Sequence, residues 1–301
     1  MGRIAFVFSG QGDQFPGMGR DLYKAYPAAR QVFDLCDSIR PGTIRQCFEG
    51  TENELKETRN TQPCLFAMEL AAASLLTERG IRPEAVAGFS LGEVVAATYA
   101  GLVERETGFS LVCKRGELMQ RAADALDTSM VAVVKLEAAK VRELCAAYSA
   151  VYPVNFNCPG QVSVAGRSEQ MVHFAADVRA AGGRALPIKV KGGFHSPFMN
   201  GAAEAFGREL ESVDFHTPAV TLYSNKTAAP YEGSPADLLS QQICSPVLWE
   251  DLIRHMIASG IDIFVEIGPG KTLKNMIGKI DPTVKCYTTA DLPTIFEEVA
   301  P

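Results

Sequence analysis

Short apolar runs recur along the chain and are separated by longer stretches in which apolar and polar residues mix. Runs of this length without polar alternation are typical of strands that are buried on both faces of a parallel sheet. We expect such strands at residues 4–8, 81–88, 220–224, 261–267 and, as an edge strand, 284–288. The pattern therefore predicts an α/β fold built on a parallel sheet.

The longer stretches predict helices. Residues 18–80 should be helical in several pieces, with breaks at Pro27, residues 41–42, Gly50 and Pro63. The piece that follows Pro63 is so apolar that we expect it to pack beneath the sheet. This helix is expected at residues 64–79, and further helices are expected at 94–100, 105–125, 200–213, 235–243, 246–259 and 271–280.

The middle of the chain has a different order of elements. Strands are expected at 130–136, 151–157, 161–166 and 184–190, and helices at 138–149 and 168–181. The order βαββαβ is that of a ferredoxin-like unit. We therefore expect a hydrolase-like α/β main domain of residues 1–127 and 192–301, into which a small ferredoxin-like domain of residues 128–191 is inserted.

The charge balance limits the classes of partner. The 301 residues include 29 Lys and Arg and 35 Asp and Glu, which gives a net charge of −6. Because nucleic-acid binding requires a basic face, nucleic acid is not expected as a partner. The first apolar run is too short for a signal peptide, and no run approaches the roughly 20 apolar residues that span a membrane. We expect no membrane association.

The eight cysteines show no CxxC pair and no metal-ligand spacing with the four histidines. Such cysteines are typical of reduced, mostly buried thiols in a cytoplasmic protein. The sequence therefore predicts a cytoplasmic location and gives no indication of a metal or an organic cofactor.

One serine stands where a strand is expected to end and a helix to begin. The run Gly88-Phe89-Ser90-Leu91-Gly92 has the GxSxG pattern of a nucleophile elbow, in which the flanking glycines leave room for a strained turn. A GxSxG run alone is more often a turn than a nucleophile. The strand before it and the apolar helix after it favour the catalytic interpretation, so Ser90 is the candidate nucleophile.

A serine hydroxyl is a weak nucleophile at neutral pH and needs a base close to its oxygen. His195 is the preferred base among the four histidines, because it follows Gly192-Gly193-Phe194 where the chain returns from the insertion. The other three lie on helices or in a polar connection and are expected to be structural or exposed. No acidic residue has an obvious place beside His195. We therefore expect a Ser90/His195 dyad in which a backbone carbonyl can orient the imidazole.

Two backbone amides and one arginine complete the candidate site. An oxyanion at the substrate carbonyl needs two donors, and the N–H groups of Leu91 and Gln11 are the natural pair. Arg115 lies on the expected helix 105–125 and precedes Gly116, which would give a ligand space. Beside the serine, Arg115 would suit an acyl group with a free carboxylate; the alternative is a salt bridge at the surface or between domains.

Seven motifs together resemble one known family. They are FVFSGQGDQ, GFSLGE, KRGELMQ, NFNCPGQVSVAG, GGFHSPFM, QQICSPVLW and EIGPGKTL, and they follow one another over nearly the whole chain. The chain is similar to the malonyl-CoA:acyl carrier protein transacylases of fatty-acid synthesis and the acyltransferase domains of polyketide synthases. The two-part architecture predicted above is also that of this family.

The resemblance implies a role for ten residues. The implied catalytic residues are Ser90, His195 and Gln242, the oxyanion donors are Gln11 and Leu91, and the substrate-binding residues are Arg115, Phe194, Asn155, Asn157 and Met119. By this resemblance, Gln242 orients His195 through its backbone carbonyl and Arg115 binds the malonyl carboxylate. Phe194 is the family's signature for malonyl over methylmalonyl.

Three positions depart from the family pattern. Phe89 stands before the nucleophile where histidine is usual, and Ser9 and Gly193 stand where proline is common. Position 89 is not catalytic, so its effect is expected on acyl selectivity rather than on activity. The two other changes are expected to be tolerated in turns.

The resemblance implies a ping-pong reaction. Ser90 takes the malonyl group from malonyl-CoA, and the phosphopantetheine thiol of acyl carrier protein then takes it from the serine, for fatty-acid synthesis. The carrier's acidic helix is expected to meet Lys189 and Lys191, and the protein is expected to be a monomer. The alternatives are a trans-acting polyketide-synthase acyltransferase and a serine thioesterase or acyl hydrolase.

Overall fold

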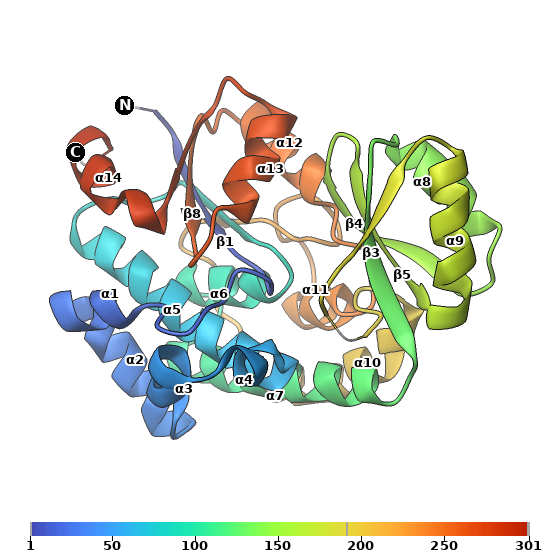
Figure 1. Ribbon diagram of the computed structural model, residues 1–301. Helices are drawn as coiled ribbons and strands as arrows, with labels where there is room; N and C mark the ends of the chain where they lie inside the picture. Colours follow the sequence, from blue (N-terminus) through green and yellow to red (C-terminus); the bar gives the residue numbers. More distant parts are fainter. Residues whose placement is uncertain (1, 191, 300–301) are drawn as a thin grey trace.

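The computed structural model describes residues 2–190 and 192–299. It contains a parallel five-stranded sheet and an antiparallel four-stranded sheet, which lie next to each other in Figure 1. The predicted fold class, a parallel α/β sheet with a second small sheet unit, is confirmed. The domain boundaries at 127/128 and 191/192 stay a prediction.

The parallel sheet has the strand order β7-β2-β1-β8-β9. Its strands are β1 (Ile4–Phe8), β2 (Ala85–Gly88), β7 (Thr221–Leu222), β8 (Ile263–Ile267) and β9 (Lys285–Thr288). In the central strand β1, Phe8 pairs with Gly88 of β2 and with Ile267 of β8. The carboxyl ends of three neighbouring strands therefore meet at one edge of the sheet, where open α/β folds place their ligand sites.

Both faces of this sheet are covered. Along β1, Phe6 and Phe8 belong to one apolar cluster, and Ala5 and Val7 belong to another on the opposite face. The first face is covered by α5 (Thr58–Glu78) and α6 (Leu91–Tyr99), and the second by α12 (Trp249–Ala258) and α13 (Thr272–Ile280). Double coverage explains why the strands are continuous apolar runs.

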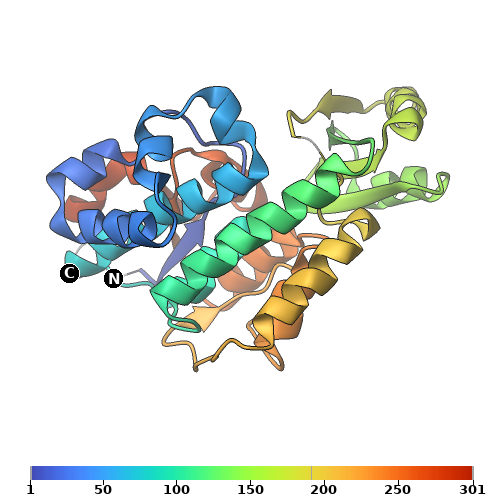
Figure 2. The same cartoon turned by 90° about the horizontal axis from the view of Figure 1, so that it is seen from below.

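The remaining helices extend this layer or lie at its border. They are α1 (Arg20–Ala25), α2 (Pro27–Ile39), α3 (Thr43–Glu49), α4 (Glu52–Lys56), α7 (Arg105–Asp124), α10 (Asn200–Leu210), α11 (Pro235–Gln242) and α14 (Leu292–Glu298). Figure 2 shows the long helix α7 running beside α10 toward the antiparallel sheet, and the two helices are in contact. Every helix within the described ranges is too short or too polar to span a bilayer.

The largest departures from the predicted helices are at α5 and α14, whereas α6, α8, α10 and α12 differ from the predicted bounds by one to three residues. Helix α5 begins at Thr58, whereas the sequence placed its start after Thr61-Gln62-Pro63; the predicted break at Pro63 is wrong, because Pro63 lies inside the helix. The backbone N–H of Thr58 donates to Gln120 Oε1 at 2.7 Å, so a side chain of α7 satisfies an amide of the first turn. The C-terminal helix α14 was not expected, because its seven residues show too short a pattern.

The antiparallel sheet has the order β4-β5-β3-β6. Its elements are β3 (Thr128–Val134), α8 (Ala138–Ala146), β4 (Val151–Cys158), β5 (Gln161–Arg167), α9 (Ser168–Ala180) and β6 (Arg184–Pro187). This is the predicted βαββαβ order, although β6 ends three residues before Val190. Alternate residues of β3 face opposite ways: Val131 and Val133 pack in the cluster of α8 and α9, and Met130 and Ala132 line a cleft.

Candidate active site

The elbow has the geometry that the GxSxG pattern predicts. Ser90 lies two residues after Gly88, the last residue of β2, and directly precedes α6, with φ 57° and ψ −106°. A Cβ at Gly88 would lie 1.8 Å from the Gly92 carbonyl carbon, and a Cβ at Gly92 would lie 2.4 Å from the Phe8 carbonyl oxygen. Both positions therefore require glycine. The strained serine is held with its side chain half-buried at the edge where β1, β2 and β8 end.

His195 lies against this serine. Its Nε2 is 2.7 Å from Ser90 Oγ, and its Nδ1 is 2.9 Å from the backbone carbonyl oxygen of Gln242. The carbonyl can only accept, so it fixes the tautomer with the proton on Nδ1 and leaves Nε2 to accept the serine proton. The structure thus brings together the dyad and the orienting carbonyl in the expected arrangement.

Arg115 is fully buried beside the nucleophile. Its Nη2 donates to Ser90 Oγ at 3.3 Å and to Gln242 Oε1 at 2.7 Å, and its Nη1 donates to Gln62 Oε1 at 2.8 Å. All three acceptors are uncharged oxygens, which differs from the surface or interdomain salt bridge considered as the alternative. The guanidinium therefore brings a positive charge to the serine without a direct hydrogen bond to a carboxylate, the nearest acid being Glu93 behind Gln242.

Burial sets the protonation states of this pair. It lowers the pKa of His195 to about 4, with the Arg115 charge acting in the same direction. It also lowers the pKa of Arg115 to about 10, which the neighbouring Glu93 opposes. At neutral pH the imidazole is therefore neutral and able to accept a proton, while the guanidinium is charged.

The candidate oxyanion donors lie on the two loops beside Ser90. Leu91 is the first residue of α6 and Gln11 lies in the loop after β1; both line the same cleft as the serine. Within the described residues, neither backbone N–H donates to another group. These amides are free to serve a developing negative charge, and the N-terminal end of α6 adds its dipole in the same place.

The cleft has a volume of about 280 Å³ and lies between the two sheets. Its walls bring together the remaining residues named from the sequence, which are Phe194, Asn155, Asn157 and Met119. The Oδ1 atoms of both asparagines are buried without a hydrogen-bond partner among the described residues. No group of three or more His, Cys, Asp or Glu in those residues could hold a metal ion.

Comparison with known proteins shows the family of this chain. The model of the acyl transferase domain family matches residues 5–285. This chain belongs to the acyl transferase family. It is 36% identical to malonyl CoA-acyl carrier protein transacylase of Bacillus subtilis, over 98% of this chain and 96% of that protein.

Solved structures of the acyl transferase family superpose closely on this chain. Malonyl CoA-acyl carrier protein transacylase from Clostridium perfringens has a TM-score of 0.95 at 30% identity, covering 99% of this chain and 97% of that chain. A malonyl-transacylase in complex with its type II polyketide-synthase acyl-carrier protein has a TM-score of 0.94 at 32% identity, covering 98% and 99%.

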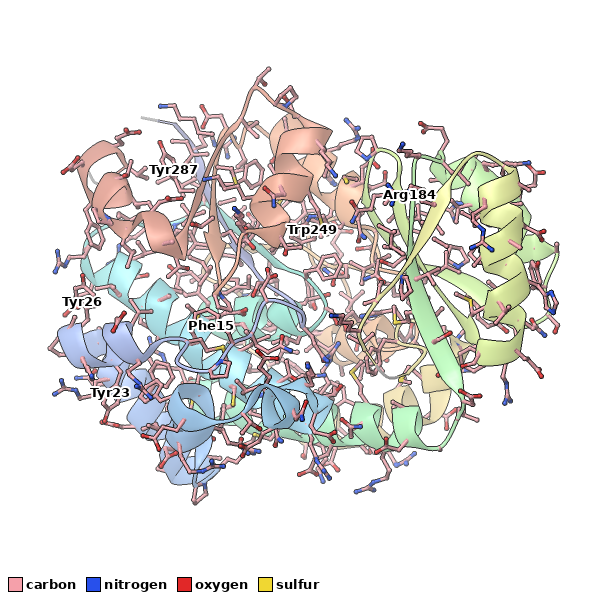
Figure 3. All side chains as sticks on the ribbon, viewed as in Figure 1. Phe15, Tyr23, Tyr26, Arg184, Trp249 and Tyr287 are labelled. Atoms are coloured by element: carbon pink, nitrogen blue, oxygen red, sulfur yellow. The ribbon has the colours of Figure 1, made fainter. Side chains whose placement is uncertain are left out.

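The departure of this acyl transferase at position 89 has a packing explanation. The Phe89 ring stands edge-on to the Trp249 ring, with centroids 5.4 Å apart, and belongs to the apolar cluster on the α12 and α13 face. Figure 3 labels Trp249 on the side of the parallel sheet that faces the antiparallel one. Phe89 also lines the cleft, so it presents an apolar surface to the substrate and anchors the elbow to α12.

Four residues of the site were missed by the sequence analysis. They are Gln62, Glu93, Asn225 and Tyr231, which form hydrogen bonds around the elbow. Two signals could have found some of them. Glu93 extends the GxSxG run by one residue, and Asn225 comes directly after an apolar strand at the ligand-binding edge of the sheet.

The departure at position 9 also has a partner. Ser9 is buried at the end of β1, and its Oγ donates to Oε1 of Glu69, a fully buried residue inside α5, at 2.5 Å. Proline at position 9 would offer no such donor. Burial raises the pKa of Glu69 well above its ordinary value, and the charges of Glu266 and Asp13 add to this. We therefore expect Glu69 to be neutral beneath the loop that carries Gln11.

This buried acid predicts a pH dependence of stability. In the unfolded chain Glu69 ionises near its ordinary pKa of 4.5, whereas the folded chain keeps the proton to higher pH. Its contribution to the free energy of unfolding is present below 4.5 and falls as the pH rises through the raised pKa, by about 1.4 kcal/mol per pH unit. Relative to the parent, Glu69→Gln should therefore gain stability steadily above pH 4.5, as measured by urea unfolding at several pH values.

Glu78→Gln is the matched control, because Glu78 lies at the exposed end of the same helix. Its unfolding free energy should follow that of the parent. The same pH dependence for Glu69→Gln and the parent would show that Glu69 is ionised in the folded protein.

Proposed function

We propose that this chain transfers a malonyl group from malonyl-CoA to the phosphopantetheine thiol of an acyl carrier protein, for fatty-acid synthesis, through a malonyl ester of Ser90. The observation that carries this proposal is the buried, charged Arg115 within 3.3 Å of Ser90 Oγ. A fixed guanidinium at this place suits an acyl group with a free carboxylate. The relatives described above are named for malonyl transfer.

In the first half-reaction Ser90 Oγ attacks the thioester carbonyl carbon while His195 Nε2 accepts the serine proton. The N–H groups of Gln11 and Leu91 stabilise the resulting oxyanion, which is the role that backbone donors have in acyl transfer. When the intermediate collapses, the carbon–sulfur bond breaks and His195 returns the proton to the sulfur of coenzyme A. Malonyl-Ser90 remains, with its carboxylate on Arg115.

The second half-reaction reverses these roles. The phosphopantetheine thiol of the carrier gives its proton to His195, and its sulfur attacks the ester carbonyl. The proton then passes to Ser90 Oγ as the ester bond breaks. The low pKa of His195 serves both steps, because the imidazole must be neutral each time it acts as a base. Asn155 and Asn157 line the cleft, where their amide side chains suit the amide groups of a pantetheine arm.

The carrier is proposed to approach at the mouth of the cleft. A groove next to Gln11 is lined by Phe15, Lys56 and Lys189, and Lys189 is exposed. Lys189 suits the acidic helix of a carrier protein, whereas Lys56 pairs with Glu52, which lines the same groove. The other predicted contact, Lys191, lies outside the described residues. We further propose that the protein acts in the cytoplasm as a monomer.

Initial-rate kinetics with malonyl-CoA and holo carrier protein test the proposal. A malonyl-enzyme intermediate predicts parallel lines in double-reciprocal plots, with product formed on the carrier. A thioesterase would release malonate at the same rate whether or not the carrier is present. Carriers of fatty-acid and polyketide systems should be compared, and a preference for the polyketide carrier would favour the trans-acting acyltransferase instead.

Phe194 gives a prediction on acyl selectivity. Its side chain is 7% exposed and lines the cleft next to His195, so it occupies space that a branched acyl group would need. Phe194→Ser should raise kcat/KM for methylmalonyl-CoA relative to malonyl-CoA by about tenfold, the effect of relieving one methyl-sized clash. An unchanged ratio in competition assays would exclude Phe194 as the residue that rejects the branch.

A further inference from the structure

A buried carboxyl that takes no part in the steps above lies directly behind the elbow. Glu93 is the third residue of α6 and is fully buried. Its Oε2 accepts hydrogen bonds from Gln242 Nε2 at 2.9 Å and from the Asn225 backbone N–H at 3.1 Å. Its Oε1 accepts from the Tyr231 hydroxyl at 2.5 Å. The carboxyl thus joins α6 to three residues that lie 132, 138 and 149 positions further along the chain.

The Gln242 side chain links this carboxyl to the reaction site. Its Nε2 donates to Glu93 Oε2 and, at 2.6 Å, to the Ser90 backbone carbonyl, while its Oε1 accepts from Arg115 Nη2. The Gln242 backbone carbonyl holds His195. One residue therefore contacts Glu93, Arg115, Ser90 and His195.

The direction of the Gln242 amide matters for Arg115. An amide has an acceptor oxygen on one side and an NH₂ donor on the other, and a guanidinium has donors only. An ionised carboxylate has acceptors only, so Glu93 requires the NH₂ on its own side and leaves Oε1 to face Arg115. In the reversed orientation the NH₂ would face the guanidinium, donor against donor.

We infer that Glu93 is a positioning residue that fixes the direction of the Gln242 amide and, through it, seats the Arg115 guanidinium beside Ser90, so that it sets the preference for acyl groups that carry a carboxylate. This inference rests on the proposed function. It assigns to Glu93 an effect on selectivity that simple support of the elbow would not have.

The charge of Glu93 gives this role a pH signature. Burial raises the pKa of Glu93 to about 7, against the opposing effects of its hydrogen bonds with Tyr231, Gln242 and Asn225 and of the Arg115 charge. Among the described residues, Tyr231 and Arg115 are the titratable groups that face this carboxyl. Once protonated, Glu93 can also donate a hydrogen bond, so the direction of the Gln242 amide is then held only by the neutral acceptors of Nε2, the Ser90 carbonyl and Asn225 Oδ1. The malonyl preference should therefore fall as the pH drops through about 7.

The test is the ratio of Ser90 acylation rates with malonyl-CoA and acetyl-CoA, measured by quenched-flow mass spectrometry across this pH range. Taking a ratio cancels the protonation of His195, which both acyl groups share. In the parent the ratio should rise with pH, with a midpoint near 7. In Glu93→Gln it should be about tenfold lower than the parent at high pH, and it should not change with pH.

Tyr231→Phe is the conservative partner variant. The Tyr231 hydrogen bond lowers the pKa of Glu93, so its removal should move the midpoint to higher pH. At sufficiently high pH the variant should recover the parent ratio, because the carboxylate is still present. A role limited to supporting the fold predicts neither the shift nor the recovery.

The inference is overturned if the parent ratio does not change with pH, or if Glu93→Gln slows both acylations equally. If Glu93→Gln does not fold, as judged by circular dichroism, the parent and Tyr231→Phe profiles decide. Arg115→Ala separates this inference from the proposed function. If the loss of Arg115 leaves the ratio unchanged, carboxylate binding by Arg115 fails; if it lowers the ratio and Glu93→Gln does not, only the role of Glu93 fails.

Discussion

Arg115→Ala is expected to slow malonylation of Ser90 about 100- to 1,000-fold, a loss that lies within the 2–5 kcal/mol that truncating one partner of a buried, hydrogen-bonded charge pair typically costs. The rate with acetyl-CoA should change much less, because the acetyl group has no carboxylate. The reason lies in the burial of Arg115 and in its uncharged partners, Gln62 and Gln242, which orient the guanidinium without neutralising it. Quenched-flow mass spectrometry measures the acylation rates of Ser90 with malonyl-CoA and with acetyl-CoA.

Arg115→Lys is the matched variant. It keeps the positive charge but loses the planar fork that can pair both carboxylate oxygens. The malonylation rate of this variant should fall between those of the parent and Arg115→Ala. Equal losses with malonyl-CoA and acetyl-CoA in Arg115→Ala would mean that the arginine supports the fold of the site rather than binding a carboxylate.

His195→Gln should slow acylation of Ser90 by about 10²–10⁴-fold, the usual contribution of a general base. The loss should be equal for malonyl and acetyl groups, because both reactions need the same proton transfer across the 2.7 Å contact between Nε2 and Ser90 Oγ. The residual rate should rise with pH, since hydroxide then replaces the base. In the parent, a His195 pKa of about 4 keeps the base neutral throughout the neutral range.

His216→Gln is a suitable control, because the His216 side chain is 44% exposed and pairs at the surface with Glu104. Its acylation rates should equal those of the parent. A His195→Gln variant that still acylates at more than a tenth of the parent rate would contradict the role of His195 as the base.

Local sequence signals were sufficient for the centre of the site. Ser90 and Gln11 each follow a continuous apolar run, and His195 stands where the chain returns from the inserted unit. These signals concern a few neighbouring residues, and the backbone conformation they require is set by glycines at 88 and 92 that no other residue could replace. The parallel strand register then brings the segments together.

The supporting residues could not be predicted in the same way. Glu93 and Gln242 meet across 149 positions of the chain, and Ser90 and Asn225 across 135. Neither contact has a local pattern, because each depends on how helices and loops pack after the sheet has formed. The same holds for the start of α5, where Gln120 of another helix satisfies the first turn.

The pairing of Ser9 with Glu69 shows a further limit. The sequence analysis treated Ser9 as a tolerable change in a turn and did not single out Glu69. The structure joins them in a buried hydrogen bond directly before the loop of Gln11. The serine at position 9 and the buried acid at position 69 are therefore explained only by their contact with each other.

The malonyl ester of Ser90 is the central claim, and intact-protein mass spectrometry tests it most directly. The protein is mixed with malonyl-CoA alone, and holo carrier protein is then added. We predict a mass increase of one malonyl group, located by peptide mapping on Ser90, absent in Ser90→Ala and passed to the carrier when it is added. No adduct, an adduct that persists in Ser90→Ala, or an adduct lost to water equally fast with and without the carrier would contradict the account.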